Sequence, residues 1–299
     1  MNDLTASVLD RITDPSVRLW WPGLASRLVN DLSQKHRFNL ASYSTSAWIT
    51  QGTISPQRLF AIRNTCLIRT QAVVEVLSPA LQQRYGIPDC RFWKVDELEQ
   101  GAALELLASS LDEIAAMPEL SDTVGQLAHR IHLLMPHDDA YDVNFSEPEL
   151  PLSIFVSIPQ QPREHMRWRV AEAIVHEAGH LQLSLVERVV PLIASPQAQY
   201  YSPWRKTARP VGGVLHGLYV FGMIAEWMAR SSAPPSHVRR RLADIDQEAR
   251  EIADFAEASG LTAIGAALAR NILMRISAAV SFPVSSEPEN EGATLQESQ

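Results

Sequence analysis

The sequence is poor in cysteine, has no excess of basic residues and contains no long uninterrupted apolar run. Its 299 residues include only two cysteines, Cys66 and Cys90. This excludes a disulfide framework and a four-cysteine zinc cluster, so we expect both to be packing residues. With 26 basic against 34 acidic side chains, no broad positive surface is expected for nucleic acid or an anionic membrane.

Two further patterns argue against a membrane or secreted protein. The longest apolar run, from Val211 to Ala225, is interrupted by His216 and is shorter than the roughly 20 residues that a bilayer span needs. The first residues, MNDLTASVLDRIT, contain acidic side chains and no apolar stretch, unlike a secretory signal. We therefore predict a soluble cytoplasmic protein.

A composition that is 46% hydrophobic provides for a substantial core. We predict one catalytic domain over residues 1–283 and a disordered tail over 284–299, which is low in hydrophobic residues. Apolar residues recur at helical spacing, and the Arg239–Arg241 run is expected on a solvated helix face. Helices are predicted over residues 55–86, 95–117, 121–135, 164–190 and 212–230, and again after 235.

One strand is predicted over Leu150–Pro159, where β-branched and aromatic residues stand between prolines. Residues 195–210, rich in tyrosine, proline and arginine, are predicted to form a loop between two helices. The expected fold class is mainly α with a small β element (α+β), zincin-like only in its motif.

The stretch VAEAIVHEAGHLQLSL, residues 170–185, carries an H-E-x-x-H motif inside an apolar helix. On a helix, His176 and His180 lie one turn apart on one face, so both imidazoles can reach a single ion. Glu177 is one position round the helix, within reach of a metal-bound water. The alternative is two histidines bonded to backbone carbonyls and a glutamate paired with an arginine.

A catalytic metal needs a third protein ligand, and the next apolar helix offers two. His216 is flanked by small residues that leave room beside the ring. Glu226 is about 15 Å further along that helix, so the two side chains are not expected to bind the same ion. We prefer His216, because imidazole is the commonest metal ligand. The alternative role for Glu226 is an ion pair with an arginine.

Two other metal patterns fit less well. After His180 the sequence lacks the H-x-x-G-x-x-H continuation of metzincins. The HDD run at 137–139 has the H-x-D spacing of barrel-type iron oxygenases, but those need a strand-rich barrel, so a solvated turn is expected there. A structural metal site would require a fourth side chain, and none stands out.

Four segments together resemble a known family: HEAGH, YYSPWRKTARP, GVLHGLYVFGMIAEW and the upstream NFSEPELPLSIFVSIP. The combination is similar to the HExxH-motif domain family of 2-oxoglutarate- and Fe(II)-dependent peptide β-hydroxylases associated with peptide-modification gene clusters, over about residues 50–275. The resemblance implies natural-product biosynthesis and Fe(II) rather than zinc. It also implies that the helix histidines and a downstream histidine, matching His176, His180 and His216, hold the iron.

A 2-oxoglutarate cosubstrate needs a cation for its far carboxylate, preferably a planar guanidinium. Arg205 and Arg209, on the segment leading into the His216 helix, are the candidates. Arg209 is preferred because Pro210 stiffens its position, and Lys206 is a weaker option. The alternative is that both arginines are solvated surface residues.

Two enzyme hypotheses follow. The first is an oxygenase that uses Fe(II), 2-oxoglutarate and O₂ to hydroxylate an sp³ carbon, expected to be the β-carbon of a residue in a peptide or bound to a carrier protein. There Glu177 would orient a ligand or the cosubstrate. The alternative is a zinc metallopeptidase with Glu177 as the general base. The arginine-bearing segment favours the oxygenase.

Overall fold

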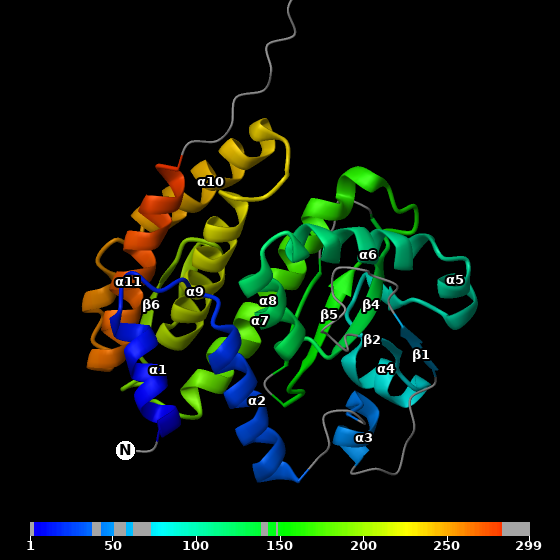
Figure 1. Ribbon diagram of the computed structural model, residues 1–299, viewed down its shortest axis with the longest axis horizontal. Coiled ribbons are helices and arrows are strands. Elements are labelled where there is room, and N and C mark those ends of the chain that lie inside the picture. Colours follow the sequence, from blue (N-terminus) through cyan, green and yellow to red (C-terminus); the bar gives the residue numbers. More distant parts are fainter. Residues whose placement is uncertain are drawn as a thin grey trace, which may run out of the picture.

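The computed structural model describes residues 3–37, 43–50, 58–61, 73–138, 143–147 and 149–282 (Figure 1). This part of the chain is mainly helical with small sheets, so the predicted fold class is confirmed. The described helices are α1 (Asp3–Thr13), α2 (Pro22–His36), α3 (Thr45–Thr50), α4 (Pro79–Tyr85), α5 (Val95–Glu99), α6 (Ala102–Ala115), α7 (Pro118–Leu127), α8 (Arg167–Glu187), α9 (Val211–Met228), α10 (Pro235–Arg250) and α11 (Ala263–Val280).

Five strands form the main sheet and two more form a separate hairpin. In the main sheet β4 is central and pairs with β5, β2 and β3, while β1 pairs with β2. The β4 pairs with β2 and β5 are parallel, and its pair with β3 is antiparallel. The strands are β1 (Arg58–Ala61), β2 (Val73–Val76), β3 (Cys90–Phe92), β4 (Arg130–Pro136), β5 (Ser153–Ser157), β6 (Gln199–Ser202) and β7 (Thr207–Pro210).

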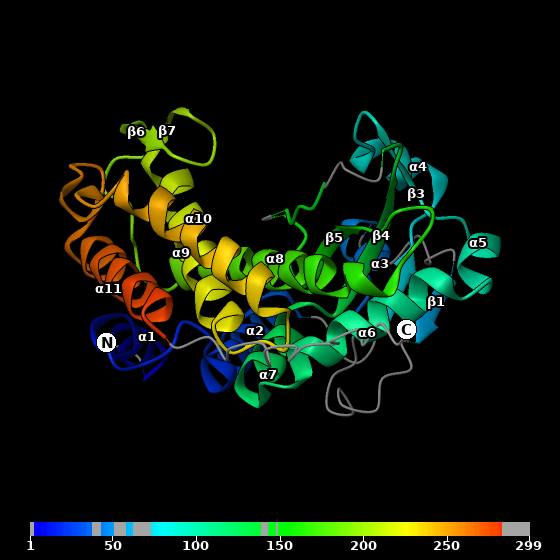
Figure 2. The same cartoon turned by 90° about the horizontal axis from the view of Figure 1, so that it is seen from above.

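Helix α8 connects the two sides of the molecule. Figure 2 shows it running from the main sheet toward the group of helices α1, α9, α10 and α11, with the β6–β7 hairpin standing beside α9. It packs against β5, α6 and α7 at the sheet side and against α9 at the other. A short 3-10 turn over Glu164–Met166 precedes it, and the helix ends at Glu187, close to the predicted range of 164–190.

Helices α8 and α9 come close together at a glycine inside the H-E-x-x-H motif. A β-carbon on Gly179 would lie 3.0 Å from the Met223 sulfur and 3.0 Å from a methyl group of Val220, both on α9. The absence of a side chain at this position allows close backbone approach. The motif therefore lies where the two helices are in close contact, so side chains of α9 are near the motif histidines.

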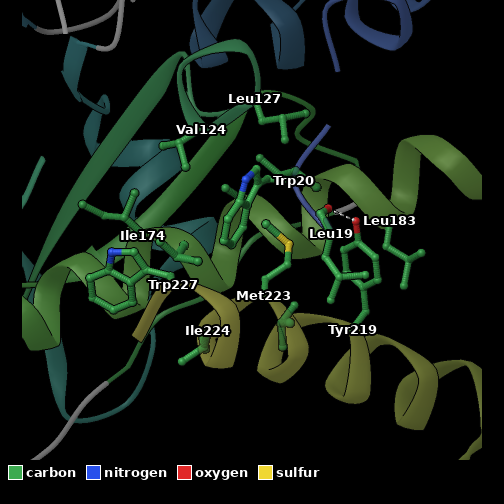
Figure 3. Packing of buried hydrophobic residues seen from close by; sticks show 14 of the residues in the cluster. Leu19, Trp20, Val124, Leu127, Ile174, Leu183, Tyr219, Met223, Ile224 and Trp227 are labelled. Atoms are coloured by element: carbon green, nitrogen blue, oxygen red, sulfur yellow. Dashed lines mark hydrogen bonds between the residues drawn. The ribbon is translucent and has the colours of Figure 1, made fainter. Parts of the chain in front are cut away.

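A shared core surrounds this helix pair. In Figure 3 side chains from α7, α8 and α9 pack around Trp20, which lies in the segment between α1 and α2. The Tyr219 hydroxyl on α9 donates to the Leu19 carbonyl at 2.8 Å, and the Gln182 amide on α8 donates to the same carbonyl at 2.8 Å. These two buried donors are thus hydrogen-bonded, and the N-terminal segment is held against both helices.

Two predicted helices are partly strands. The described parts of residues 55–86 form β1, β2 and α4, and residues 121–135 contain α7 followed by β4. All seven residues of β4 are buried. A strand buried on both faces shows no apolar-polar alternation, so its sequence does not distinguish it from a buried helix. Pairing with neighbouring strands, which depends on residues distant in sequence, decides the outcome.

The predicted loop over residues 195–210 is also wrong in part, because it contains the β6–β7 hairpin. Ser202 is opposite Thr207 in the register, and Lys206 adopts a left-handed backbone with a φ of 50° at the turn. The two strands are mostly exposed. Isolated two-stranded hairpins are marginal in water, so packing against α9 stabilises this one.

Some predictions fall on residues that the structure leaves undescribed: the tail over 284–299, Cys66 and Asp139 of the HDD run. Elsewhere the hydrophobic core extends from Val8 to Ala279, and the single domain stays a prediction.

Helices α9 and α11 are long and apolar enough to cross a membrane by length and composition, a test that core helices also pass. In these two helices 72% and 33% of the apolar window is buried.

Candidate metal centre and adjoining cavities

The two motif histidines face one another on α8. Their Nε2 atoms are 3.1 Å apart, and the rings meet edge to face. Burial lowers the pKa of His176 to about 4, with further lowering from the nearby charges of Arg241 and Arg205. Burial also lowers the pKa of His180 to about 2, and its two histidine neighbours add to this effect. Both rings are therefore neutral at pH 7 and carry the lone pairs that a metal requires.

His216, the predicted third ligand, lies on α9 beside this pair. Its Nδ1 is 3.2 Å from the Nδ1 of His180, and the two rings are stacked with centroids 5.4 Å apart. On its other side, the Nε2 of His216 is 3.1 Å from the Oε2 of Glu187. A carboxylate at this distance fixes a ring tautomer, since it accepts the Nε2 proton and leaves Nδ1 bare.

Each neighbouring pair of histidines has a spacing that suits a shared metal ion, but the three rings are not arranged around one point. Two imidazole nitrogens on a tetrahedral ion, each about 2.0–2.1 Å from it, lie roughly 3.3 Å apart. Both observed separations are close to this value. However, His180 directs Nε2 at His176 and Nδ1 at His216, so the three rings do not share one point. Accordingly, no group of three or more His, Cys, Asp or Glu side chains among the described residues has a metal-holding arrangement.

Glu226, the alternative third ligand, is engaged elsewhere. Its carboxylate forms an ion pair with Arg275 of α11 and accepts a hydrogen bond from the Leu19 backbone N–H at 3.2 Å. Burial raises the pKa of this carboxyl, and Arg275 acts in the opposite direction. The ion-pair alternative raised from the sequence is thus the one observed, and Glu226 lines neither of the cavities described next.

A cavity of about 370 Å³ is lined by all three histidines. The β6–β7 hairpin brings Arg205 and Arg209 to the same cavity. Neither guanidinium forms an ion pair within the described part of the chain. Lys206 instead pairs with Glu251 at 3.2 Å. The remaining lining residues are Ser202, Trp204, Gly213, Gly217 and Phe221.

Glu177 lies at a second cavity of about 300 Å³, next to the first. Its carboxyl is buried and accepts a hydrogen bond from the Ser146 hydroxyl at 2.8 Å. Burial raises the pKa of Glu177 to about 8, against the lowering effect of Ser146. His176 and Phe221 line both cavities, and the other residues of the second one are Asn144, Arg169, Glu172, Ala173 and Arg241.

Sequence reasoning missed two side chains of this region. Glu187 follows His180 by seven residues, two helical turns along the same face, and that spacing was a usable signal. Arg241 was predicted to be solvated as part of an arginine run, but it follows the helical spacing of the buried residues Val238, Leu242 and Ile245. Its own side chain is 23% exposed and pairs with Glu172.

A larger cavity of about 580 Å³ lies at α1 and α2 and contains no histidine. Comparison with known proteins adds no assignment to any of these sites, because no protein-family model matches the chain and no curated protein is significantly similar to it.

Proposed function

We propose that the protein is an Fe(II)- and 2-oxoglutarate-dependent oxygenase that hydroxylates an sp³ carbon, the β-carbon of an amino-acid residue in a peptide or on a carrier protein. One observation carries the proposal. Two arginines without ion-pair partners among the described residues share a cavity with three clustered histidines. A dianionic cosubstrate that also binds the metal needs this combination of donors.

The chain's own residues have separable roles in this scheme. His176, His180 and His216 would hold the iron, which supplies oxygen activation when bound. Arg209 and Arg205 bind the far carboxylate of 2-oxoglutarate through parallel N–H donors, which fixes its direction. Trp204 and Phe221 stack on one another and line one side of the cavity. His180 directs a different nitrogen at each of the other two histidines, so its ring would have to turn for all three to hold one ion.

The alternative function is a zinc metallopeptidase. It is favoured by the place of Glu177, whose carboxyl lines a cavity together with His176, where a general base would stand. The arginine pair in the other cavity has no role in that reaction. In the oxygenase, the hydrogen bond between Glu177 and Ser146 holds α8 in place beside the metal ligands.

An anaerobic titration separates the two functions. The protein is loaded with Fe(II), and 2-oxoglutarate is added while the visible charge-transfer band of the chelate is followed. The oxygenase predicts a saturable band at one iron per chain. Absence of the band, together with tight zinc binding and cleavage of peptides, would establish the peptidase instead.

The same titration tests the arginines. For Arg209→Ala we expect the 2-oxoglutarate concentration at half-saturation to rise roughly 10- to 100-fold at unchanged iron content, since a charged hydrogen bond contributes about 1.5–3 kcal/mol. Lys206→Ala is the matched control, because Lys206 is in the same hairpin but pairs with Glu251. Unchanged half-saturation in Arg205→Ala, Arg209→Ala and the double variant would refute this binding role.

A further inference from the structure

The second cavity differs from the first in the charges that line it. The first cavity is lined by two arginines and by no aspartate or glutamate. The second has Arg169 and Arg241 together with Glu172 and Glu177, and also the amide of Asn144. The first cavity thus suits an anion, whereas the second offers donors and acceptors of both signs. Such a lining matches groups that both donate and accept hydrogen bonds, as amides do.

An aromatic partition stands between the two cavities. The Phe221 ring stacks on Trp204, with centroids 5.1 Å apart and planes at 18°. On the other cavity's side the Arg241 guanidinium carbon is 5.3 Å from the Phe221 centroid. Trp204 lines only the first cavity and Arg241 only the second. Phe221 therefore lies between the cavity lined by Arg205 and Arg209 and the cavity lined by charges of both signs.

The two spaces meet at a candidate metal ligand. His176 lines both cavities, and its ring contacts Phe221 edge to face at 5.5 Å. A molecule in the second cavity therefore reaches the same histidine as a molecule in the first. Two reactants that must approach one metal without competing for one binding space require such an arrangement.

The Arg241–Glu172 pair forms the polar wall of the second cavity. Nε and a terminal nitrogen of Arg241 are 2.8 and 2.7 Å from the Oε1 of Glu172. The side chains are 23% and 19% exposed, so they are held in place while still reaching the cavity. The pair leaves carboxylate lone pairs and guanidinium N–H groups for a ligand, since each group has more bonding sites than the pair uses.

We propose that the second cavity is the substrate subsite and that Arg241 and Glu172 bind the uncharged main-chain amides of an extended peptide there, at the same time as the cosubstrate occupies the first cavity. Arg241 donates to a substrate carbonyl and Glu172 accepts a substrate N–H. Both are positioning residues, which hold the substrate residue against His176. The inference rests on the proposed function in one respect, because that function identifies 2-oxoglutarate as the molecule in the first cavity.

Ligand-observed NMR on the full chain tests this directly. The probe is N-acetyl-alanine N-methylamide, an alanine with an amide on each side, and saturation transfer from protein to probe is measured. We expect transfer in the wild type and about a 5-fold weaker affinity in Arg241→Met/Glu172→Leu, which removes both hydrogen-bonding partners without leaving an unpaired charge. Arg250→Met is the control, since Arg250 is also on α10 but pairs with Asp246 and lines neither cavity.

A second probe tests simultaneous occupancy. N-oxalylglycine, an unreactive analogue of 2-oxoglutarate, is added to the zinc-loaded protein; it should leave saturation transfer to the diamide unchanged. Arg209→Met should weaken the binding of the analogue and leave the binding of the diamide unchanged. No transfer in the wild type, unchanged transfer in the double variant, or displacement of the diamide by the analogue would each overturn the proposal.

The outcomes also separate this inference from the proposed chemistry. If the Fe(II) and 2-oxoglutarate titration fails while the diamide binds through Arg241, the oxygenase is wrong and the subsite stands. If the titration succeeds and the diamide binds the double variant as tightly as the wild type, the subsite is wrong and the oxygenase stands. Retained binding of N-oxalylglycine by the double variant shows that it has folded.

Discussion

At the scale of single residues, His216 is the side chain on which the candidate centre depends most. One of its nitrogens faces His180 and the other faces Glu187, so neither is directed to solvent. A ring bonded to a carboxylate through Nε2 can offer only Nδ1 to a metal. Glu187 therefore determines which atom of His216 is available, although it does not itself touch the other histidines in any observed contact.

Loss of Glu187 should weaken metal binding without removing a ligand. For Glu187→Ala we expect metal affinity to fall about 10- to 100-fold, the usual effect of losing the carboxylate partner of a metal-bound histidine. Competition titration with Co(II) measures it. Asp31→Ala is a matched control, because Asp31 is 35% exposed against 30% for Glu187, pairs with Lys35 on α2 and lines neither cavity. Equal affinities for both variants would exclude this role.

At the scale of elements, two glycines set how α9 meets its neighbours. Gly179 lets α8 and α9 approach, and Gly217 makes room for the hairpin. A β-carbon on Gly217 would lie 2.5 Å from the Trp204 ring, which rests against the helix at that point. The hairpin that carries Arg205 and Arg209 is thus seated on α9 one residue beyond His216. Its arginines depend on that contact for their place beside the histidines.

Filling the space at Gly217 should displace the hairpin. For Gly217→Ala we expect a loss of about 1–3 kcal/mol in unfolding free energy from overpacking, less up to about 1 kcal/mol gained in helix propensity. Gly213→Ala, on the same helix, has no atom within 4 Å of the added carbon and should stabilise instead. Urea unfolding followed by tryptophan fluorescence compares the two. Equal stabilities would show that Trp204 moves aside at no cost.

At the scale of the whole molecule, one buried ion pair joins distant parts of the chain. Glu226 on α9 pairs with Arg275 on α11, and Arg275 also donates to the backbone carbonyls of Pro15 and Val17 before α2. The side chains of Glu226 and Arg275 are 4% and 13% exposed. The pair therefore fastens the N-terminal segment and the last helix to the helix that carries His216.

Breaking this pair should cost stability and spare the metal. For Glu226→Ala we expect unfolding free energy to fall by about 3–5 kcal/mol, because the Arg275 charge is left buried without its partner. Glu226→Leu/Arg275→Met, which removes both charges, should recover much of the loss. Iron content should stay at the wild-type level in the variants that fold and be lost in His216→Ala. Iron retained by His216→Ala but lost by Glu226→Ala would make Glu226 the third ligand.

The sequence by itself determined the long helices and the candidate histidines. The helix over 164–190 was predictable as a long stretch that Pro191 ends, and the one over 212–230 because it is apolar nearly all round, which indicates a buried helix. Local geometry also places His176 and His180 on one face whatever surrounds them. The mainly α class with a small β element followed from the same periodicity. These features depend on residues that are near one another in the chain.

Strand β5 lies within the strand predicted over Leu150–Pro159, but tertiary structure alone decided the other strands, the hairpin and the composition of the site. Strand β4 is buried on both faces, so no alternation in its residues distinguishes it from a helix. Arg241 reaches the cavity because α10 packs beside α9, 65 positions after His176 in the chain. Contacts between segments so distant in sequence depend on packing and strand pairing, and local spacing contains no information about them.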